Sequence, residues 1–477
     1  MSAEDRKRIE KSLKRKLDFG MMPLIILIYI LNYLDRQSIS QARLSTFQED
    51  LNLDDRQYQN AVALLFPLYI AMQVPSNMML AWCGKPSLYL GTFVCIWGVV
   101  SGCTAACQNY GQLVAVRVIL GGIEAPFFPG ALFLLSKWYT RRELSTRMGL
   151  LYAGSIISNA FAGLIAAPVL ANMQGTRGLA AWRWLFIIEG SITVFVGLCV
   201  MYLLPDFPHN TTRFYSEEEK AVAVQRLAED AGESDIEGEN GGAWKGFILC
   251  VLDPKVWILT FMLFASVLGL SFNAFFPTIV KTLGYDRITT LFLTVPIWFW
   301  AFVCVYLNAL HADKTGERFY HISIPLGTGM IAFIIAAATN NIPARFFAMF
   351  IMASSYAGYV IILSWMSNSI PRPAYKRAVA LAMINCIANT GNLAGAYIFP
   401  AKWGSSYWQS FTICATMFLA TIVLAFVLRL MLIRENKKLD REFGEVEVRP
   451  KNISDHEAVE SPEERVLRAR RNFRYLI

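Results

Sequence analysis

Two short segments of this 477-residue chain place charged side chains inside long runs of apolar residues. The first segment reads Asn32-Tyr33-Leu34-Asp35-Arg36-Gln37, and the second begins at Arg117 and reaches Glu124 seven residues later. An ionisable residue in the middle of a membrane costs about 2.5–3.5 kcal/mol on insertion scales, so each one is a candidate functional residue. If these runs cross a membrane, both segments predict a functional site.

The residue types in these segments suit an anion and a proton. A guanidinium presents a planar fork that binds a carboxylate at two points. A carboxylic acid in an apolar setting can take up and release a proton near neutral pH. Glu124 follows Arg117 by two helical turns and therefore shares its face. We expect Arg36 and Arg117 to frame a cationic pocket, with Asp35 and Glu124 beside it. A second reading stays open, in which Asp35 neutralises Arg36 and Glu124 anchors helix packing.

Further polar residues lie in other apolar runs. Glu189 follows Arg183, and we interpret the two as a pair that anchors a helix at the membrane interface, while a direct role of Glu189 in the site stays open. Asn385, Asn389 and Asn392 have helical spacing, so they either line a pathway or form hydrogen bonds between helices. The shape of a pocket depends on aromatic residues whose inward or outward direction the sequence does not reveal. These are Tyr33, Phe66, Tyr69, Phe127, Phe272, Phe276, Trp298, Tyr356 and Trp365.

The composition indicates the elements that hold these residues. Hydrophobic residues make up 55% of the chain, charged residues 17%, and the mean hydropathy is +0.40. The apolar runs are about 20 residues long, the length of helix that crosses ~30 Å of hydrocarbon. Lipid offers no partner for free backbone amides, which favours helices. We predict an all-α membrane protein with twelve transmembrane helices in two pseudo-symmetric six-helix bundles. The predicted spans are 20–41, 57–80, 87–107, 111–137, 147–171, 184–204, 254–280, 289–310, 321–339, 344–369, 377–400 and 408–432.

Basic residues alternate between the loops, as the positive-inside rule requires. They gather in 6–16, 137–147, 372–377 and 434–438, whereas the loops between are acidic or poor in charge. Both termini are therefore predicted to be cytoplasmic. The net charge of +8 arises at the ends of spans, so we expect the lipid bilayer as a partner and no nucleic acid.

The chain divides into two halves around one long polar connection. Ser216 and Glu219 fit a capping box that opens a short surface helix. Gly163-x4-Pro168 and Gly395-x4-Pro400 repeat at an equivalent place in the two halves, as in transporters built from parallel repeats. The expected parts are a cytoplasmic N-terminal arm (1–19), a six-helix bundle (20–204), a cytoplasmic central loop (205–250), a second bundle (251–433) and a cytoplasmic tail (434–477).

Signals for catalysis or for bound metal are missing from the sequence. The nine cysteines show no CxxC spacing and lie mostly in apolar runs. No HExxH or GxSxG motif occurs. We expect no metal site, no cofactor and no enzymatic activity.

The order of these features resembles the major facilitator superfamily, and more closely the fungal allantoate permease-like branch of its anion:cation symporter family. The resemblance is carried by Tyr33-Leu34-Asp35-Arg36, by the run from Arg117 to Gly130, and by 182–190. The segment 313–318 resembles the superfamily's cytoplasmic gating motif, whereas its first-half copy, 81–86, lacks the acidic residue.

This resemblance implies a monomeric secondary transporter of the plasma membrane that imports a small organic anion with protons, by alternating access. Nicotinate, pantothenate, biotin and allantoate are candidate cargoes. The implied substrate-binding residues are Arg36, Arg117, Asn32, Tyr33, Asn385 and Asn389. The implied proton-coupling residues are Asp35 and Glu124. The implied gating residues are Asp313, Lys314, Gly316 and Arg318.

Two other functions remain open at this stage. In one, the protein is a facilitator or exporter of neutral solutes or drugs, and its intramembrane charges are structural. In the other, it is a nutrient receptor that has lost transport, for which the charged tail is suited.

Overall fold

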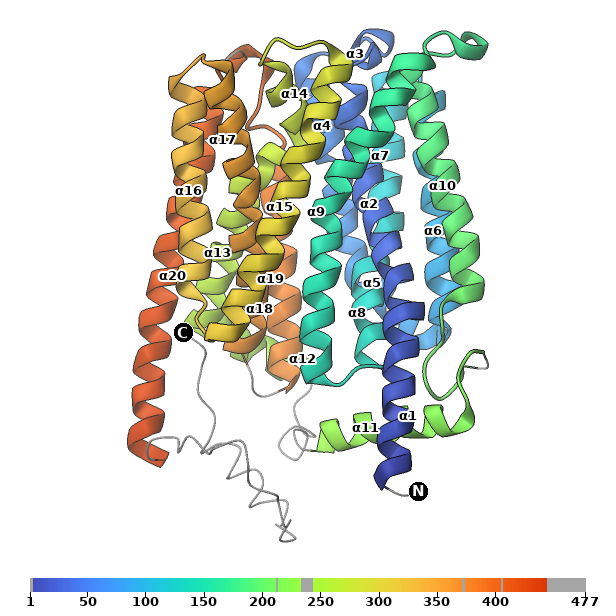
Figure 1. The fold of residues 1–477 in the computed structure, drawn as a ribbon, viewed down its shortest axis with the longest axis vertical. Helices are drawn as coiled ribbons and strands as arrows, with labels where there is room; N and C mark the ends of the chain where they lie inside the picture. Colours follow the sequence, from blue (N-terminus) through green and yellow to red (C-terminus); the bar gives the residue numbers. More distant parts are fainter. Residues whose placement is uncertain (1–2, 212, 233–242, 371–373, 405, 444–477) are drawn as a thin grey trace.

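The computed structural model describes residues 3–211, 213–232, 243–370, 374–404 and 406–443. Every regular element in this part of the chain is helical. Eleven of the described helices are long and apolar enough to cross a membrane, and a shorter apolar helix, Val379–Gly395, adds one more. The predicted all-α fold class is confirmed. The first helix begins and the last helix ends at the same end of the molecule, as an even number of crossings requires (Figure 1).

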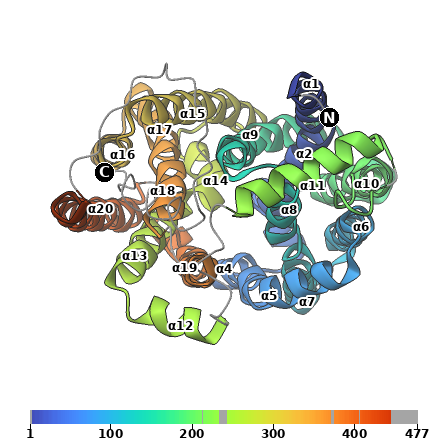
Figure 2. The ribbon, with the colours of Figure 1, turned by 90° about the horizontal axis from the view of Figure 1, so that it is seen from below.

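The helices form two groups that lie side by side when the molecule is seen from below (Figure 2). The first bundle consists of α2 (Met22–Ala42), α4 (Asp55–Ala63) with α5 (Leu65–Cys83), α6 (Pro86–Cys103), α7 (Tyr110–Glu124) with α8 (Phe127–Ser136), α9 (Arg141–Asn172) and α10 (Ala181–Leu203). The second consists of α13 (Pro254–Gly269) with α14 (Phe276–Lys281), α15 (Arg287–Thr315), α16 (Phe319–Ala338), α17 (Ile342–Ser354) with α18 (Tyr356–Ser369), α19 (Ala374–Gly395) and α20 (Trp408–Phe443). A short helix, α3 (Phe47–Asp50), follows α2.

Several crossings are broken near their middle, and one break positions a candidate residue. Helix α7 ends at Glu124, and α8 begins at Phe127 after a turn that contains Pro126. Proline has no backbone N–H and clashes with the preceding turn, which explains the break. Irregular backbone at membrane depth is tolerated where it is buried in protein or lines a cavity. The break therefore places the Glu124 side chain at a helix end inside the bundle.

Helices α6 and α10 approach each other closely along a row of glycines. A methyl group on Gly98 would lie 2.9 Å from the carbonyl oxygen of Gly190, and one on Gly190 would lie 2.5 Å from that of Gly98. Small residues are what permit such close backbone contact between membrane helices. This contact brings the polar side chains of α6 and α10 against α2.

The two bundles are joined by hydrogen bonds at the end opposite α1 (Figure 1). Ser40 donates to the carbonyl oxygen of Ala274 over 2.5 Å, and Tyr397 donates to Asn60 over 2.7 Å. The backbone N–H of Ala401 donates to Asp55 over 2.6 Å. These contacts close that end of the space between the bundles.

Two helices lie outside the membrane spans at the other end. Helix α11 (Glu217–Gly232) begins with the predicted capping box, because Ser216 Oγ accepts from the N–H of Glu219 and the Glu219 carboxylate accepts from the N–H of Ser216. Helix α1 (Ala3–Lys16) packs on α11, and Lys16 forms a 2.8 Å ion pair with Glu219. A further short helix, α12 (Ala243–Val251), precedes α13. Helix α20 continues through Phe443, so residues 434–443 of the expected tail prolong the last span, and 444–477 lie outside the described residues.

Candidate functional site

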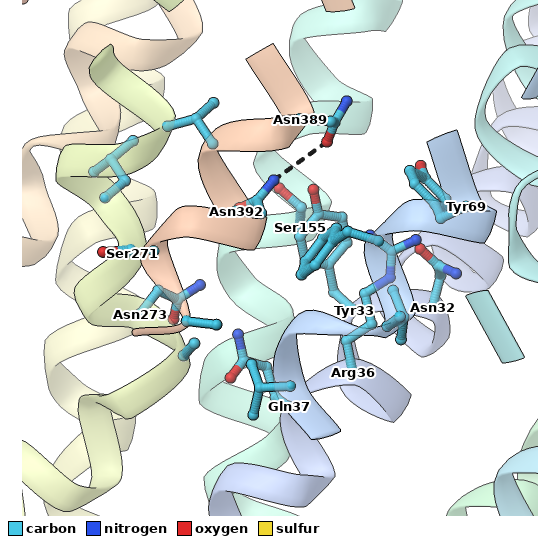
Figure 3. Close-up of a pocket in the computed structure, with 18 of the residues that line it drawn as sticks. Asn32, Tyr33, Arg36, Gln37, Tyr69, Ser155, Ser271, Asn273, Asn389 and Asn392 are labelled. Carbon is cyan, nitrogen blue, oxygen red and sulfur yellow. Dashed lines mark hydrogen bonds between the residues drawn. The ribbon is translucent and has the colours of Figure 1, made fainter. Parts of the chain in front are cut away.

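A cavity of ≈ 160 Å³ lies between the two bundles (Figure 3). The first bundle contributes side chains from α2, α4, α5, α7, α8 and α9, and the second contributes side chains from α13, α18, α19 and the turn before α14. The six residues that the resemblance assigns to substrate binding all line it: Asn32, Tyr33, Arg36, Arg117, Asn385 and Asn389.

Arg36 reaches across the first bundle to Glu124. Its Nε lies 2.6 Å from Glu124 Oε2, and its guanidinium carbon lies 4.4 Å from the centre of the Tyr69 ring. Among the described residues, neither its Nη2 atom nor Glu124 Oε1 has a hydrogen-bond partner. The ion pair is therefore single rather than bidentate, and each partner keeps unused hydrogen-bonding capacity.

Arg117 is buried on the same wall, and its position differs from that of Arg36. Its Nε donates to the backbone carbonyl oxygen of Ala61 over 3.1 Å, and only 3% of the residue is exposed. Among the described residues, no carboxylate forms an ion pair with it. Arg117 is thus a buried cation that faces the cavity and is held by a neutral group.

Asp35 does not face the cavity. Its carboxylate accepts hydrogen bonds from Trp97 Nε1 at 3.0 Å, from Ser101 Oγ at 2.9 Å and from Thr193 Oγ1 at 3.2 Å. Neighbouring residues in a helix point about 100° apart, so Asp35 faces α6 and α10 while Arg36 faces the cavity. The reading in which Asp35 neutralises Arg36 is therefore wrong. Glu124 lies beside the cavity, as expected, and Asp35 lies behind it.

The predicted pair of Arg183 and Glu189 is also wrong. Arg183 donates to the backbone carbonyl oxygens of Ala105 and, over 2.9 Å, of Cys107. Glu189 instead contacts Ser38 of α2. Residues six apart on a helix of 3.6 residues per turn point to different faces, which prevents their side chains from meeting.

Asparagine side chains form a hydrogen-bonded row on the opposite wall. Asn389 donates to Asn385 Oδ1 over 3.2 Å. Asn392 donates to Asn389 Oδ1 over 3.2 Å, as the dashed line in Figure 3 shows. Asn385 also donates to Gln73 of the first bundle over 3.4 Å. Both readings of these asparagines hold, because they line the cavity and one of them bonds across to another helix.

The sequence missed several residues of the cavity wall. Gln37, Ser155, Asn159, Ser271 and Asn273 add polar groups, and Tyr29, Phe128, Tyr152 and Tyr359 add rings. Of the nine aromatic residues singled out from the sequence, Tyr33, Phe66, Tyr69 and Tyr356 line the cavity, whereas Phe127, Phe272, Phe276, Trp298 and Trp365 are buried elsewhere. The helical spacing of Tyr29 with Tyr33 and Arg36 is a signal in the sequence that could have found Tyr29, because residues at this spacing share one face of a helix.

The expected gating segment lies at the lower end of the second bundle. Gly316 ends α15 in the left-handed conformation, with φ +69°, and Arg318 forms a 2.8 Å ion pair with Asp313. Glu317 forms a 3.3 Å ion pair with Arg429 of α20, and Lys314 is exposed. These ion pairs lie within one bundle and do not join the two.

The described residues contain no group of three or more His, Cys, Asp or Glu side chains that is placed to hold a metal ion. Two helical bundles around a central polar cavity are the architecture of a secondary transporter, in which the bundles rock about a site near the membrane midplane.

Comparison with known proteins gives the family. Residues 25–396 match the Major Facilitator Superfamily, and the chain belongs to it. The chain is 31% identical over 444 residues to the MFS-type transporter cnsO of Penicillium expansum, covering 90% of this chain and 84% of that protein. It is 27% identical over 446 residues to the major facilitator-type transporter hxnP of Emericella nidulans, covering 91% and 88%. The protein is therefore a multi-pass membrane transporter and not an enzyme.

Solved structures agree on the fold. A bacterial homologue of the human lysosomal transporter Spinster, in an inward-facing and occupied conformation, superimposes with a TM-score of 0.67 at 15% identity, covering 87% of this chain and 97% of that one. The proton:xylose symporter XylE of the same superfamily, bound to 6-bromo-6-deoxy-D-glucose, gives 0.67 at 16% identity, covering 85% and 94%. At these identities the likeness concerns the fold alone.

Proposed function

We propose that this transporter imports a small organic anion together with protons, in the manner of the anion:cation symporter family and its fungal allantoate permease-like branch. Carboxylate vitamins and nitrogen sources such as nicotinate, pantothenate, biotin and allantoate are the proposed cargoes. The observation that carries this proposal is Arg117, a buried guanidinium on the cavity wall that forms no ion pair with a described carboxylate.

An unneutralised buried cation is costly, because removing a charge from water is repaid only by a well-placed opposite charge. Arg117 is an inefficient way to hold helices together, since an uncharged donor would satisfy the Ala61 carbonyl oxygen at lower cost. A carboxylate cargo would supply the missing charge, and a guanidinium binds it through two parallel hydrogen bonds. Substrate binding at Arg117 therefore accounts for the residue in a way that a structural role does not.

The Arg36–Glu124 pair offers a way to couple the anion to a proton. While Glu124 is ionised, it occupies the guanidinium of Arg36 at 2.6 Å. Protonation of Glu124 removes the negative charge and weakens the pair, so Arg36 becomes available to a second oxygen of the cargo. Anion and proton then bind together, which is the requirement for symport. Asp35, the other proposed proton-coupling residue, is next to Arg36 on α2, and its carboxyl lies behind the cavity wall.

The rest of the wall provides hydrogen bonds and flat apolar faces. The amide nitrogen of Asn32 has no partner among the residues that the structure describes, and Asn385 and Asn389 lie across the cavity from it. The ring centres of Tyr33 and Tyr69 lie 5.6 and 4.4 Å from the guanidinium carbon of Arg36. A compact carboxylate with a planar or polar body fits a cavity of ≈ 160 Å³ with these walls.

The energetics of symport suit such a cargo. A monoanion that enters a cell against a negative interior is opposed by about 2.3 kcal/mol per 100 mV. One proton carried with it cancels that cost. Each pH unit of gradient then contributes about 1.4 kcal/mol to uptake.

The closed end of the cavity is proposed to face outward, with both termini cytoplasmic and the protein a monomer in the plasma membrane. The proposed parts of the chain are the N-terminal arm (1–19), the two bundles (20–204 and 251–433), the central loop (205–250) and the tail (434–477). Asp313, Lys314, Gly316 and Arg318 are proposed to act in gating at the cytoplasmic end, by rearrangement of the ion pairs at the base of the second bundle.

Uptake into proteoliposomes tests this function. Labelled nicotinate, pantothenate, biotin and allantoate are each offered at several external pH values with the internal pH held constant. If accumulation of one of them rises as the outside is acidified, the result supports symport. Uptake that does not depend on pH would contradict the symport proposal.

The Arg36–Glu124 pair favours one alternative, a facilitator or exporter of neutral solutes or drugs, because the pair is already neutral. Absence of any carboxylate uptake, with transport of a neutral solute, would favour that alternative.

A further inference from the structure

Glu189 has no role in the transport cycle described above, although it is buried deep in the first bundle. Only 1% of the residue is exposed, and it faces α2 from helix α10. Its Oε1 atom has no hydrogen-bond partner in the part of the chain that the structure describes, and its Oε2 atom contacts Ser38 Oγ. A buried carboxyl with a single neutral partner must be explained, because an ionised one would be severely penalised there.

The elements packed against α10 offer Glu189 no cation. The titratable groups that α2 contributes nearby are Asp35 and Arg36, and Arg36 is already bonded to Glu124. Helix α6 contributes Cys95 and Cys103, and α9 contributes Tyr152 within its span. The nearest charged groups are therefore another carboxylate and a guanidinium that is occupied.

Counting hydrogens at Ser38 assigns a proton to Glu189. A serine hydroxyl has one hydrogen to donate. Ser38 Oγ lies 2.8 Å from the carbonyl oxygen of Leu34 and also contacts Glu189 Oε2, and its one hydrogen can serve only one of these two oxygens. Both contacts are hydrogen bonds at once only if the Glu189 carboxyl supplies a second hydrogen. A protonated Glu189 therefore satisfies both contacts, whereas an ionised one leaves one of them without a hydrogen.

Asp35 shows the opposite pattern. All three of its partners, Trp97, Ser101 and Thr193, point a hydrogen at the carboxylate. Three donors suit an ionised acceptor. The two acids are close, since Asp35 and Ser38 lie one turn apart on α2, and Glu189 and Thr193 lie one turn apart on α10. Two carboxyls in one apolar site without a free cation do not both ionise, so the pair holds a proton.

We propose that Glu189 is a further proton-binding carboxyl of this transporter, loaded in the conformation described here and paired with Asp35. The proton enters from water when the pair is loaded and returns to water when it is released. Its use in transport rests on the proposed function, but the protonated state of Glu189 does not. The Glu189–Asp35 pair thus binds one proton in addition to the proton that Glu124 exchanges.

Infrared spectroscopy of the purified transporter in lipid nanodiscs tests the protonated state. A protonated carboxyl has a C=O band, separate from the carboxylate bands, that shifts in D2O. We expect E189Q to lower the intensity of this C=O band at neutral pH by the contribution of one carboxyl group. The matched control is E217Q, whose parent side chain on α11 is 89% exposed and pairs with Lys220, and which should leave the band unchanged. S38A should keep the band and move it to higher frequency, because the acceptor of the hydrogen bond is gone. Loss of carboxylate bands alone in E189Q would overturn the proposal.

Proton release separates a proton carrier from a permanently neutral packing residue. Raising the pH should abolish the Glu189 band while gel filtration shows that the protein stays folded. E189Q should release one proton fewer than the wild type in an unbuffered titration. A band that persists at every pH at which the protein stays folded would refute proton binding and leave a structural acid. If E189Q does not fold, the frequency shift in S38A and the titration of the wild-type band decide the question. Neither measurement uses a substrate, so failure here is distinct from failure of anion uptake.

Discussion

Arg36 and Glu124 lie 88 positions apart in the chain, yet their side chains meet in a 2.6 Å ion pair at the edge of the central cavity. The pair joins α2 to the broken end of α7, and it is the contact through which a proton could govern access to a cation. When the ion pair is intact, Glu124 and Arg36 neutralise each other. When it is broken, Glu124 can hold a proton and Arg36 can bind an anion. This relationship is the basis of the first prediction.

E124Q should uncouple the proton from the cargo. Glutamine keeps an oxygen that can accept from Arg36, but it carries no charge and exchanges no proton. We expect exchange of labelled for unlabelled cargo to continue, whereas accumulation driven by a pH gradient is lost, about tenfold for each pH unit. Counterflow and gradient-driven uptake in proteoliposomes measure the two quantities. Retention of acid-stimulated accumulation in E124Q would contradict the role of Glu124.

Arg117 should matter more to binding than its single hydrogen bond suggests. R117Q removes the unneutralised charge, and truncation of one partner of a buried charged pair costs about 2–4 kcal/mol, or roughly 30- to 1000-fold in affinity. R117K keeps the charge but loses the two-pronged geometry, so its loss should be smaller. Binding of the transported carboxylate to the purified variants gives both values. Equal affinity in R117Q and the wild type would assign Arg117 a structural role.

The positions of the charged residues were predictable because their cost in a membrane is large. Arg36, Arg117 and Glu124 stand out for that reason, and all three reach the cavity or its edge. Their pairing was not predictable. Asp35 is adjacent to Arg36 in the chain, but the helix turns their side chains apart, and Trp97 and Thr193 on other helices decide where Asp35 points.

Aromatic residues illustrate the same limit. Phe127 and Phe128 are neighbours with similar side chains, yet Phe128 lines the cavity and Phe127 packs in the core. Both faces of a membrane helix are apolar, so hydropathy does not distinguish the face toward the cavity from the face toward another helix. The two faces are assigned only once the neighbouring helices are known. The Arg183–Glu189 pair was predicted wrongly for a different reason, since residues six apart lie on different faces of one helix.

The contact between α1, α9 and α11 should weaken in acid. Burial acts to raise the pKa of Glu143, but hydrogen bonding to Lys14 and the charge of Arg226 outweigh it and hold the pKa below its ordinary value of 4.5. A carboxyl with a lowered pKa stabilises the folded state above its unfolded pKa, and that contribution is lost as the pH falls through the lower, folded value. The window thus begins near pH 4.5 and extends below it. Hydrogen exchange in α1 and α11, followed from neutral to acid pH, measures the loosening.

E143Q should produce part of this loosening at neutral pH. The variant leaves Arg226, which is 6% exposed, without its 2.5 Å ion pair, at a cost of about 1–3 kcal/mol to the local contact. Exchange of α1 and α11 amides should then be faster than in the wild type and less sensitive to acid. The exposed carboxyl of Glu217 provides the control, since E217Q removes only the pair between this 89% exposed side chain and Lys220. Identical exchange in E143Q and E217Q would show that the contact does not depend on Glu143.

The close approach of α6 and α10 gives a prediction about stability, because it holds Trp97 and Thr193 against Asp35. G98A places a methyl group 2.9 Å from the carbonyl oxygen of Gly190 and 2.9 Å from the backbone nitrogen of Val194, which are both parts of a rigid helix. Overpacking of this kind costs about 1–3 kcal/mol.

G327A is the matched control, since Gly327 lies in helix α16 with no described heavy atom within 4 Å of an added methyl group, beyond its own helix backbone. There alanine should be neutral or stabilise by up to about 1 kcal/mol through helix propensity. Thermal unfolding of the purified proteins should therefore give a lower midpoint for G98A and an unchanged or higher one for G327A. Because the added methyl group pushes α10 away from α6, G98A should also weaken the hydrogen bond from Trp97 to Asp35, and a shift in tryptophan fluorescence would report it. A G98A protein as stable as G327A would mean that the two helices separate freely and do not fix the position of Asp35.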